Sequence, residues 1–244
     1  MKKLFLKALG IGIVLSSAAG VRGDVLYDNT TTDTSSFLTF PSGQQIGEQI
    51  WLGTLTPEYL TNFSFVYYSP NSSWSETVYA DVRFYENDGT PTNGFATPST
   101  LFYDSGLISF PNPIASNGGI TASNSLNAIF ELSDLQSLAP GVTPLDPNMV
   151  LPTNFTFTVT FTGLTGGDSV GLPIYQPPTV GTNYGDYWYD VSGTWELLTN
   201  TTPVAFGAQF NGSPEPTPEP TVLCLGALGV AAMAAMARRR QQRG

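Results

Sequence analysis

Strict alternation of apolar and polar residues is the feature that most limits what this chain can fold into. Apolar residues occupy every second position from Phe155 to Phe161, and threonines occupy the alternate positions from Thr156 to Thr162. Residues 77–85 alternate in the same way. Because successive side chains of a strand point to opposite faces, a period of two is typical of a strand with one buried face. The pattern predicts two half-buried strands, at 77–85 and 154–162, and a threonine face exposed to solvent.

Eight further segments have the composition of short strands and are separated by Gly, Pro, Asn and Ser. They are residues 48–52, 59–68, 101–109, 127–132, 169–175, 187–189, 194–198 and 204–210. A helical pattern is limited to 133–138, and the polar stretch 111–125 is expected to be a loop. The sequence therefore predicts an all-β fold, an antiparallel, jelly-roll-like β-sandwich over residues 24–213.

The charges are strongly segregated along the chain. Residues 24–213 hold 17 of the 19 acids and a single base, Arg83, so their formal charge is −16 where the whole chain has −10. All other bases lie in the first 22 or the last seven residues. Nucleic-acid binding depends on Lys and Arg that neutralise phosphates, so we expect no nucleic-acid partner.

The same region lacks most catalytic side chains. The chain has no His, and residues 24–213 contain no Lys and no Cys. This excludes Ser-His-Asp and Cys-His catalysis, an internal disulfide and a His- or Cys-ligated zinc site. We expect no catalytic residues, no enzyme activity and no cofactor. A carboxylate-dependent glycoside hydrolase stays open, because the sequence does not reveal two acids that meet in a cleft.

A short match to an aspartic-protease motif occurs at Asp104-Ser105-Gly106. The second copy that such an enzyme needs is missing. A strand that ends in a Ser-Gly turn explains the match as well.

The first 23 residues are typical of a secretory signal peptide. Three lysines precede an apolar run at 8–15 and small residues at 16–20. Cleavage after Ala19, Gly20 or Gly23 fits the pattern equally well.

The C-terminal end predicts a single transmembrane helix. The 16 residues from Val222 to Ala237 carry no charge and are followed by Arg238, Arg239 and Arg240. A helix of this length measures about 24 Å, short of a hydrocarbon core of about 30 Å, so it would span with flanking residues or in a thinned bilayer. The arginines would hold the tip, residues 238–244, in the cytoplasm.

Residues 214–221 contain two Pro-Glu-Pro triplets, which predict a stiff, extended spacer. Pro218-Glu219-Pro220, the apolar segment and the terminal arginines together resemble the PEP-CTERM sorting signal of exported bacterial proteins. The resemblance implies recognition by an exosortase, a membrane transpeptidase-like enzyme, and removal of the tail. A plain single-pass anchor is the alternative.

The region before the tail is also similar to uncharacterised outer domains that accompany PEP-CTERM tails. The similar stretches are 47–52, 82–89 and 103–106. This second resemblance implies no activity.

An aromatic cluster suggests sugar binding. Tyr184, Tyr187, Trp188 and Tyr189 occur with two aspartates within residues 184–190, and sugars stack on aromatic rings while their hydroxyls bond to such polar groups. Trp74 lies in a polar, turn-like segment where a buried tryptophan is not expected. Packing in the core or on the sheet is the alternative explanation for the cluster.

Calcium binding is a further hypothesis for the acidic residues. Glu86, Asp88 and Asp104 come nearest to a cluster of carboxylates, the ligands that a hard cation prefers. A solvated acidic surface explains them equally well.

These features predict an exported cell-envelope or extracellular-matrix protein with a non-catalytic structural or adhesive domain. It would pass through a single-pass membrane form, with its C-terminus inside, before it reaches the cell surface or matrix. The alternative is a carbohydrate-binding module on the cell surface or in exopolysaccharide, and a glycoside hydrolase comes third.

Overall fold

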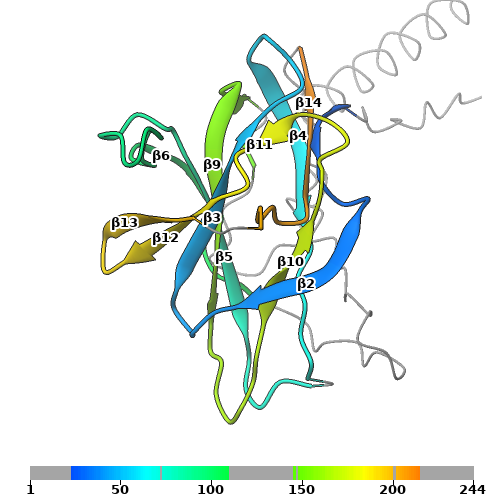
Figure 1. Ribbon diagram of the computed structural model, residues 1–244. Coiled ribbons are helices and arrows are strands. Elements are labelled where there is room, and N and C mark those ends of the chain that lie inside the picture. Colours follow the sequence, from blue (N-terminus) through cyan, green and yellow to red (C-terminus); the bar gives the residue numbers. More distant parts are fainter. Residues whose placement is uncertain (1–22, 72, 110–144, 147, 200–201, 215–244) are drawn as a thin grey trace, which may run out of the picture.

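The computed structural model describes residues 23–71, 73–109, 145–146, 148–199 and 202–214 (Figure 1). Their strands pair only in antiparallel fashion, which confirms the predicted all-β class. The strands are β1 (Asp24–Asp28), β2 (Asp33–Thr39), β3 (Gln45–Trp51), β4 (Glu58–Phe65), β5 (Tyr79–Tyr85), β6 (Leu101–Asp104), β7 (Ile108–Ser109), β8 (Val150–Leu151), β9 (Asn154–Thr162), β10 (Gly171–Tyr175), β11 (Thr182–Asn183), β12 (Tyr187–Val191), β13 (Thr194–Leu198) and β14 (Ala208–Ser213).

The strands form three sheets. The large sheet has the order β13-β12-β3-β9-β5-β6, with β11 on β3 and β7 on β5. A four-stranded sheet has the order β1-β14-β4-β8, and β10 pairs with β2 alone. β9 lies at the centre of the large sheet, where it pairs with β3 from Asn154 to Thr160 and with β5 from Thr156 to Thr162. The strand with the clearest alternation thus occupies the position with neighbours on both sides.

The inner face of the large sheet points toward the four-stranded sheet. Phe84 of β5 packs against Phe63 of β4 and Phe210 of β14, with ring centroids 5.0 and 5.5 Å apart. Phe157 of β9 lies 5.7 Å from the same Phe210 ring. Aromatic contacts across the two sheets therefore build the core.

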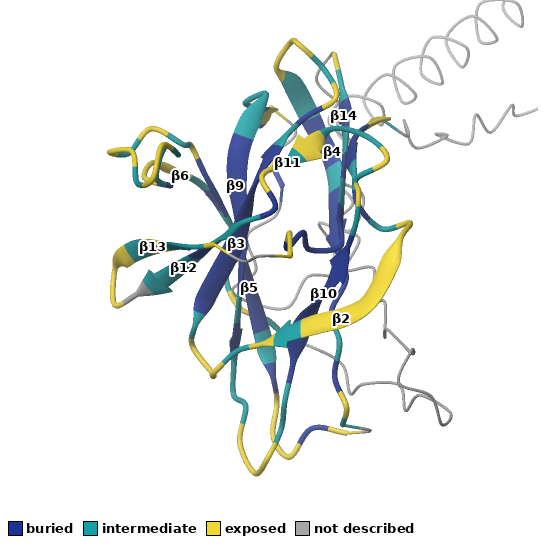
Figure 2. Ribbon diagram, in the orientation of Figure 1, coloured by how far each residue is buried: buried dark blue, intermediate teal, exposed yellow. Residues whose placement is uncertain are grey.

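The outer face of the large sheet is more deeply buried than the sequence predicts. Thr156 and Thr158 are fully buried, although the alternation predicts an exposed threonine face. Figure 2 shows much of β9 in the colour of buried residues. Only Thr160 and Thr162 are half-buried. The reason is tertiary, because segments outside β9 cover this face: Trp195 of β13 packs 5.4 Å from the Tyr85 ring, and Thr156 Oγ1 donates a hydrogen bond to Asn87.

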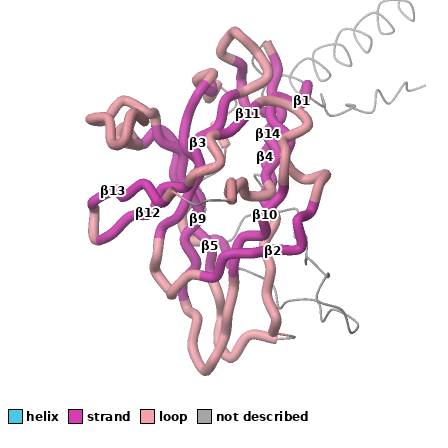
Figure 3. The backbone as a smooth tube through the Cα atoms, in the orientation of Figure 1, coloured by secondary structure: helices cyan, strands magenta, loops and turns pink. Residues whose placement is uncertain are grey.

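No helix occurs among the described residues, which consist of strands and loops (Figure 3). The predicted strand bounds at 154–162 and 194–198 agree with β9 and β13. The predicted strand 101–109 is wrong in one respect, because a turn divides it into β6 and β7. The segment 204–210 overlaps β14 only in part, since β14 begins at Ala208.

Four strands were not predicted from the sequence: β1, β2, β8 and β11. β2 has no alternation and its residues are almost all exposed, so it carries no periodic signal. β8 and β11 have only two residues each, which is too short for a pattern.

Several predicted segments lie outside the described residues. They are most of the signal peptide (1–23), the strand at 127–132, the helix at 133–138, the loop at 111–125, nearly all of the spacer (214–221), the membrane segment (222–237) and the tip (238–244). The structure therefore bears on residues 24–213 and leaves both ends as predictions.

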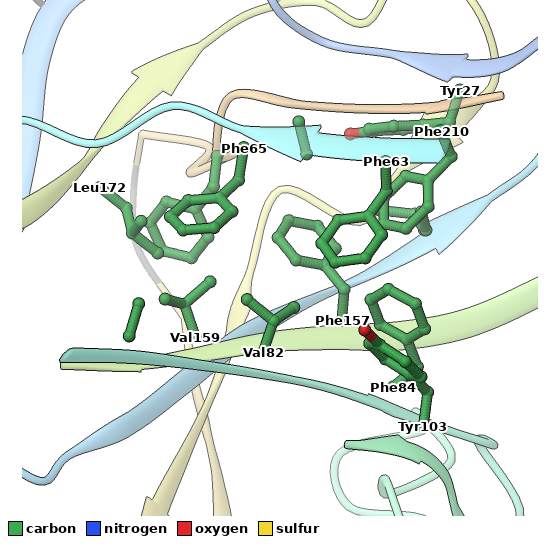
Figure 4. Close-up of a cluster of buried hydrophobic side chains, with 14 of the residues drawn as sticks. Tyr27, Phe63, Phe65, Val82, Phe84, Tyr103, Phe157, Val159, Leu172 and Phe210 are labelled. Atoms are coloured by element: carbon green, nitrogen blue, oxygen red, sulfur yellow. The ribbon is translucent and has the colours of Figure 1, made fainter. Parts of the chain in front are cut away.

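The core brings aromatic side chains from both sheets together in one cluster. Figure 4 shows Phe63, Phe65 and Phe210 of the four-stranded sheet opposite Val82, Phe84, Phe157 and Val159 of the large sheet. Trp74 belongs to the same cluster and is only 9% exposed, so the expectation that this tryptophan is not buried is wrong. The polar residues around Trp74 give no indication in the sequence that its ring is buried in the core.

Candidate functional site

Glu48 is a carboxyl group buried in the core. Its place on β3 directs it to the inner face, where the Phe206 amide donates to Oε2 at 2.6 Å and Asn183 Nδ2 donates to Oε1. Burial raises the pKa of Glu48 to about 8, against the opposing effect of these hydrogen bonds. Glu48 is fully buried, which favours the neutral form of the carboxyl, and it joins β3 to β11 and to the segment before β14.

A second group of carboxylates surrounds Arg83, the only base among the described residues. Arg83 contacts Asp81 of its own strand at 2.8 Å and Asp104 of β6 at 2.9 Å. Burial raises the pKa of Asp81 to about 6, although the Arg83 charge lowers it. The guanidinium thus neutralises acids on two adjacent strands.

The residues of the protease-like motif are engaged in the turn that ends β6. Ser105 is fully buried: its hydroxyl accepts a hydrogen bond from the Val82 amide and donates one to the Gly106 carbonyl, both at 2.8 Å. Asp104 Oδ1 accepts a hydrogen bond from the Gly106 amide at 2.8 Å. These contacts hold the turn against β5.

A pocket of about 340 Å³ opens on the outer face of the large sheet, where β3 and β9 meet the segment 86–100 between β5 and β6. We call it the outer-face pocket. Its lining residues are Gln49, Glu86, Asn87, Asp88, Ala96, Pro152 and Asn154. The volume lies at the lower end of the range of about 300–1,000 Å³ that is usual for small-molecule sites.

Hydrogen bonds between amides orient the polar groups of this pocket. Gln49 Nε2 donates to Asn154 Oδ1 at 3.0 Å, and Asn87 Nδ2 donates to the same oxygen. Thr156 Oγ1 donates to Asn87 Oδ1 at 2.6 Å. The Gln49 side-chain oxygen has no hydrogen-bond partner among the described residues, although Gln49 is only 4% exposed.

The segment 86–100 is itself ordered by hydrogen bonds. Ser99 and Thr100 bond with the backbone of Glu86, and the Gly89 amide donates to the Thr97 carbonyl at 2.9 Å. Asp88 accepts hydrogen bonds from the Thr100 amide at 2.9 Å and hydroxyl at 2.6 Å, which lower the pKa of Asp88. The Asp88 carboxylate is therefore fixed in position.

Trp51 and Phe95 are neighbours of the pocket residues Asn154 and Ala96, and both contact Tyr184. We call these three aromatic residues the aromatic rim. The Tyr184 ring lies 4.4 Å from Trp51 and 3.9 Å from Phe95, in edge-to-face geometry. Trp51 is the register partner of Asn154, so both side chains are on the outer face. Tyr184 remains 44% exposed between its two neighbours.

The structure separates the residues that the sequence suggested for sugar binding. Tyr184 lies in the aromatic rim, whereas Trp188 is 1% exposed and Trp74 is in the core. Tyr187 and Tyr189 pack against the core. Trp188 is the register partner of Gly47, which has no side chain to occupy the same face.

The sequence analysis did not single out Trp51, Phe95 or Gln49. The alternation within β3 would have placed Gln49 and Trp51 on one face, but their proximity to Tyr184 and Phe95 depends on contacts between distant segments.

The residues suggested for calcium do not form a cluster of three. Glu86 and Asp88 line the outer-face pocket, whereas Asp104 pairs with Arg83. Across the described ranges, no group of three or more acidic, Cys or His residues is arranged to hold a metal ion.

The sorting and membrane residues, Pro218 to Pro220, Val222 to Ala237 and Arg238 to Arg240, lie outside the described ranges. Within those ranges, no helix is long and apolar enough to span a bilayer.

Comparisons of the chain with protein-family models, with curated proteins and with solved structures find no match.

Proposed function

We propose that this chain is an exported, non-catalytic protein of the cell envelope or extracellular matrix, with a structural or adhesive domain and a PEP-CTERM tail. We further propose that residues 24–213 form a jelly-roll-like β-sandwich. Two antiparallel sheets that face each other across an aromatic core support this architecture.

The state of the carboxyl groups supports a role without catalysis. A glycoside hydrolase needs an acid of raised pKa that faces the substrate beside a second carboxylate. Among the described residues, the carboxyls of raised pKa are Glu48 and Asp81, which lie outside the outer-face pocket, and Asp88 inside the pocket has a lowered pKa. This arrangement favours binding over hydrolysis.

The two ends of the sequence support export and sorting. A signal peptide would direct residues 24–213 across the membrane, and the helix with its arginines would leave the C-terminus inside. An exosortase would then act on the tail and release the domain to the cell surface or matrix.

Deletion of residues 218–244 tests the sorting proposal. We expect the truncated protein to disappear from the surface and matrix fractions of its native cells, as followed by immunoblot of cell fractions. The control replaces Pro214, Glu215 and Pro216 by alanine, which alters the first triplet and leaves the second intact. An unchanged distribution of the truncated protein would show that the tail is not a sorting signal.

Carbohydrate binding is the second candidate function, and the outer-face pocket is the observation that favours it. The pocket combines oriented amides with an adjacent exposed aromatic ring. A surface or matrix protein with such a pocket would adhere to polysaccharide without altering it.

A further inference from the structure

We propose that the outer-face pocket and the aromatic rim form one site for a sugar unit of a neutral polysaccharide. The proposal rests on the proposed function, because it names the ligand of the adhesive domain. It assigns hydrogen bonding to the amides of Asn87 and Asn154 and to the Glu86 carboxylate, and stacking to Tyr184.

The polar groups of the pocket match the hydroxyls of a neutral sugar. Asn154 accepts two hydrogen bonds through its oxygen, which directs its Nδ2 donor group elsewhere. Glu86 adds carboxylate acceptors at the same pocket. Donors and acceptors thus lie close together, as a hydroxyl requires because it both donates and accepts.

Gln49 forms part of the wall of the pocket. Its side chain is buried, and its oxygen has no partner among the described residues and almost no accessible surface. Gln49 therefore acts on the site by orienting Asn154 through its Nε2 donor, and the ligand would bond to Asn87, Asn154 and Glu86.

The aromatic rim provides the stacking surface. Tyr184 is exposed but held by Trp51 and Phe95, which come from β3 and from the segment 86–100. A ring fixed in this way loses little conformational freedom when a ligand covers it. The apolar face of a sugar ring would bury the exposed part of Tyr184.

Charge excludes anionic polysaccharides from this site. Glu86 and Asp88 line the pocket, and Arg83, the only base in the described part of the chain, is paired with Asp81 and Asp104. An anionic polysaccharide would meet repulsion here without a cation to offset it.

Isothermal titration of the full-length chain in a nonionic detergent tests the proposal. The probes are dextran, a soluble mixed-linkage β-glucan and galactomannan, with alginate as the acidic polysaccharide. We expect at least one neutral polysaccharide to bind and alginate not to bind. Absence of binding to all three neutral polysaccharides, or binding to alginate alone, would overturn the proposal.

Variants of Tyr184 locate the site. Tyr184→Ala should weaken binding about tenfold or more, and Tyr184→Phe should preserve it because the ring face remains. Phe37→Ala is the matched control: Phe37 lies on β2 with 38% exposure, so its loss should leave binding unchanged. Equal loss in the Phe37 variant, or wild-type affinity in a Tyr184→Ala protein with a wild-type melting temperature, would contradict the assignment.

A second pair of variants examines the pocket independently of the rim. Glu86→Ala should reduce affinity, whereas Glu76→Ala, at an exposed acid outside the pocket, should not. Equal affinities for both variants would show that Glu86 does not contact the ligand, which would contradict the assigned site. Failure of all these titrations would leave the sorting experiment unaffected, so the two proposals fail separately.

Discussion

Glu48 shows how a single residue connects the pH of the medium to the stability of the core. Its pKa is about 8 in the folded protein, against an ordinary value of 4.5. Between these values the unfolded chain has lost the proton that the folded chain retains, so unfolding releases a proton. The contribution of Glu48 to stability is therefore greatest below pH 4.5 and is lost as the pH rises to about 8.

We expect Glu48→Gln to remove this pH dependence. The neutral amide keeps an acceptor for the Phe206 amide, and Asn183 can turn its oxygen toward the new donor. The range from pH 6 to 8 is chosen because it lies above the pKa of about 6 of Asp81. Across this range, the free energy of unfolding of the variant should increase relative to that of the wild type by up to about 1.4 kcal/mol per pH unit.

Urea unfolding at pH 6, 7 and 8 measures this difference. Glu76→Gln, at an exposed acid, is the control and should follow the wild type. Parallel wild-type and Glu48→Gln curves would show that the Glu48 carboxyl is already ionised in the folded protein.

At the scale of elements, the outer face of β9 attaches the segment 86–100 to the large sheet. Thr156 is fully buried and donates to Asn87 at 2.6 Å, and Asn87 in turn donates to Asn154. The segment carries Glu86, Asp88 and Ala96 of the pocket, and Phe95 of the rim. One strand face therefore determines the geometry of the proposed site.

Thr156→Val should loosen this attachment, because valine has the shape of threonine but leaves the Asn87 oxygen without its donor. We expect a loss of about 1 kcal/mol in the free energy of unfolding. Hydrogen exchange of the Gly89 amide, which bonds to Thr97, should also become faster. Thr156→Ser retains the hydroxyl and should keep the slow exchange. If serine and valine accelerate exchange equally, the hydroxyl is not what holds the segment.

The elements differ in how well the sequence predicted them. The bounds of β9 follow from its own alternation, and those of β13 from its composition, since both are properties of consecutive residues. The burial of Thr158 does not follow from either, because it requires Gln45 Nε2 of β3, which donates to Thr158 Oγ1 at 2.8 Å from 113 residues away. The pocket could not be predicted for the same reason, since its residues come from β3, β9 and the segment 86–100.

At the scale of the whole molecule, charge is the dominant property. Residues 24–213 carry 17 acids and one base, and that base is paired with Asp81 and Asp104. The remaining carboxylates repel one another across a compact domain, which favours the unfolded chain at low ionic strength.

Added salt should therefore stabilise the protein at pH 7. We expect the melting temperature of the full chain in a nonionic detergent to rise by about 2–5 °C between low and physiological NaCl, because salt screens the repulsion. At pH 4, where many carboxylates are protonated, the same series should give a smaller rise. Calorimetry at both pH values measures the effect, and a melting temperature independent of salt at pH 7 would refute the role of repulsion.

The sequence by itself determined the all-β class, the central strand β9 and the acidic character of residues 24–213, because alternation and charge belong to residues close together in the chain. It also supplied the prediction of an exported protein with a sorting tail. The tertiary structure decided which aromatic residues are buried and which polar ones meet. Trp74 enters the core and Trp188 is buried on the face of the large sheet where Gly47 lies, while Trp51, Phe95 and Tyr184 gather beside Gln49 and Asn154. The physical reason is that strand pairing brings distant segments together, and only these long-range contacts fix what covers each face of a sheet.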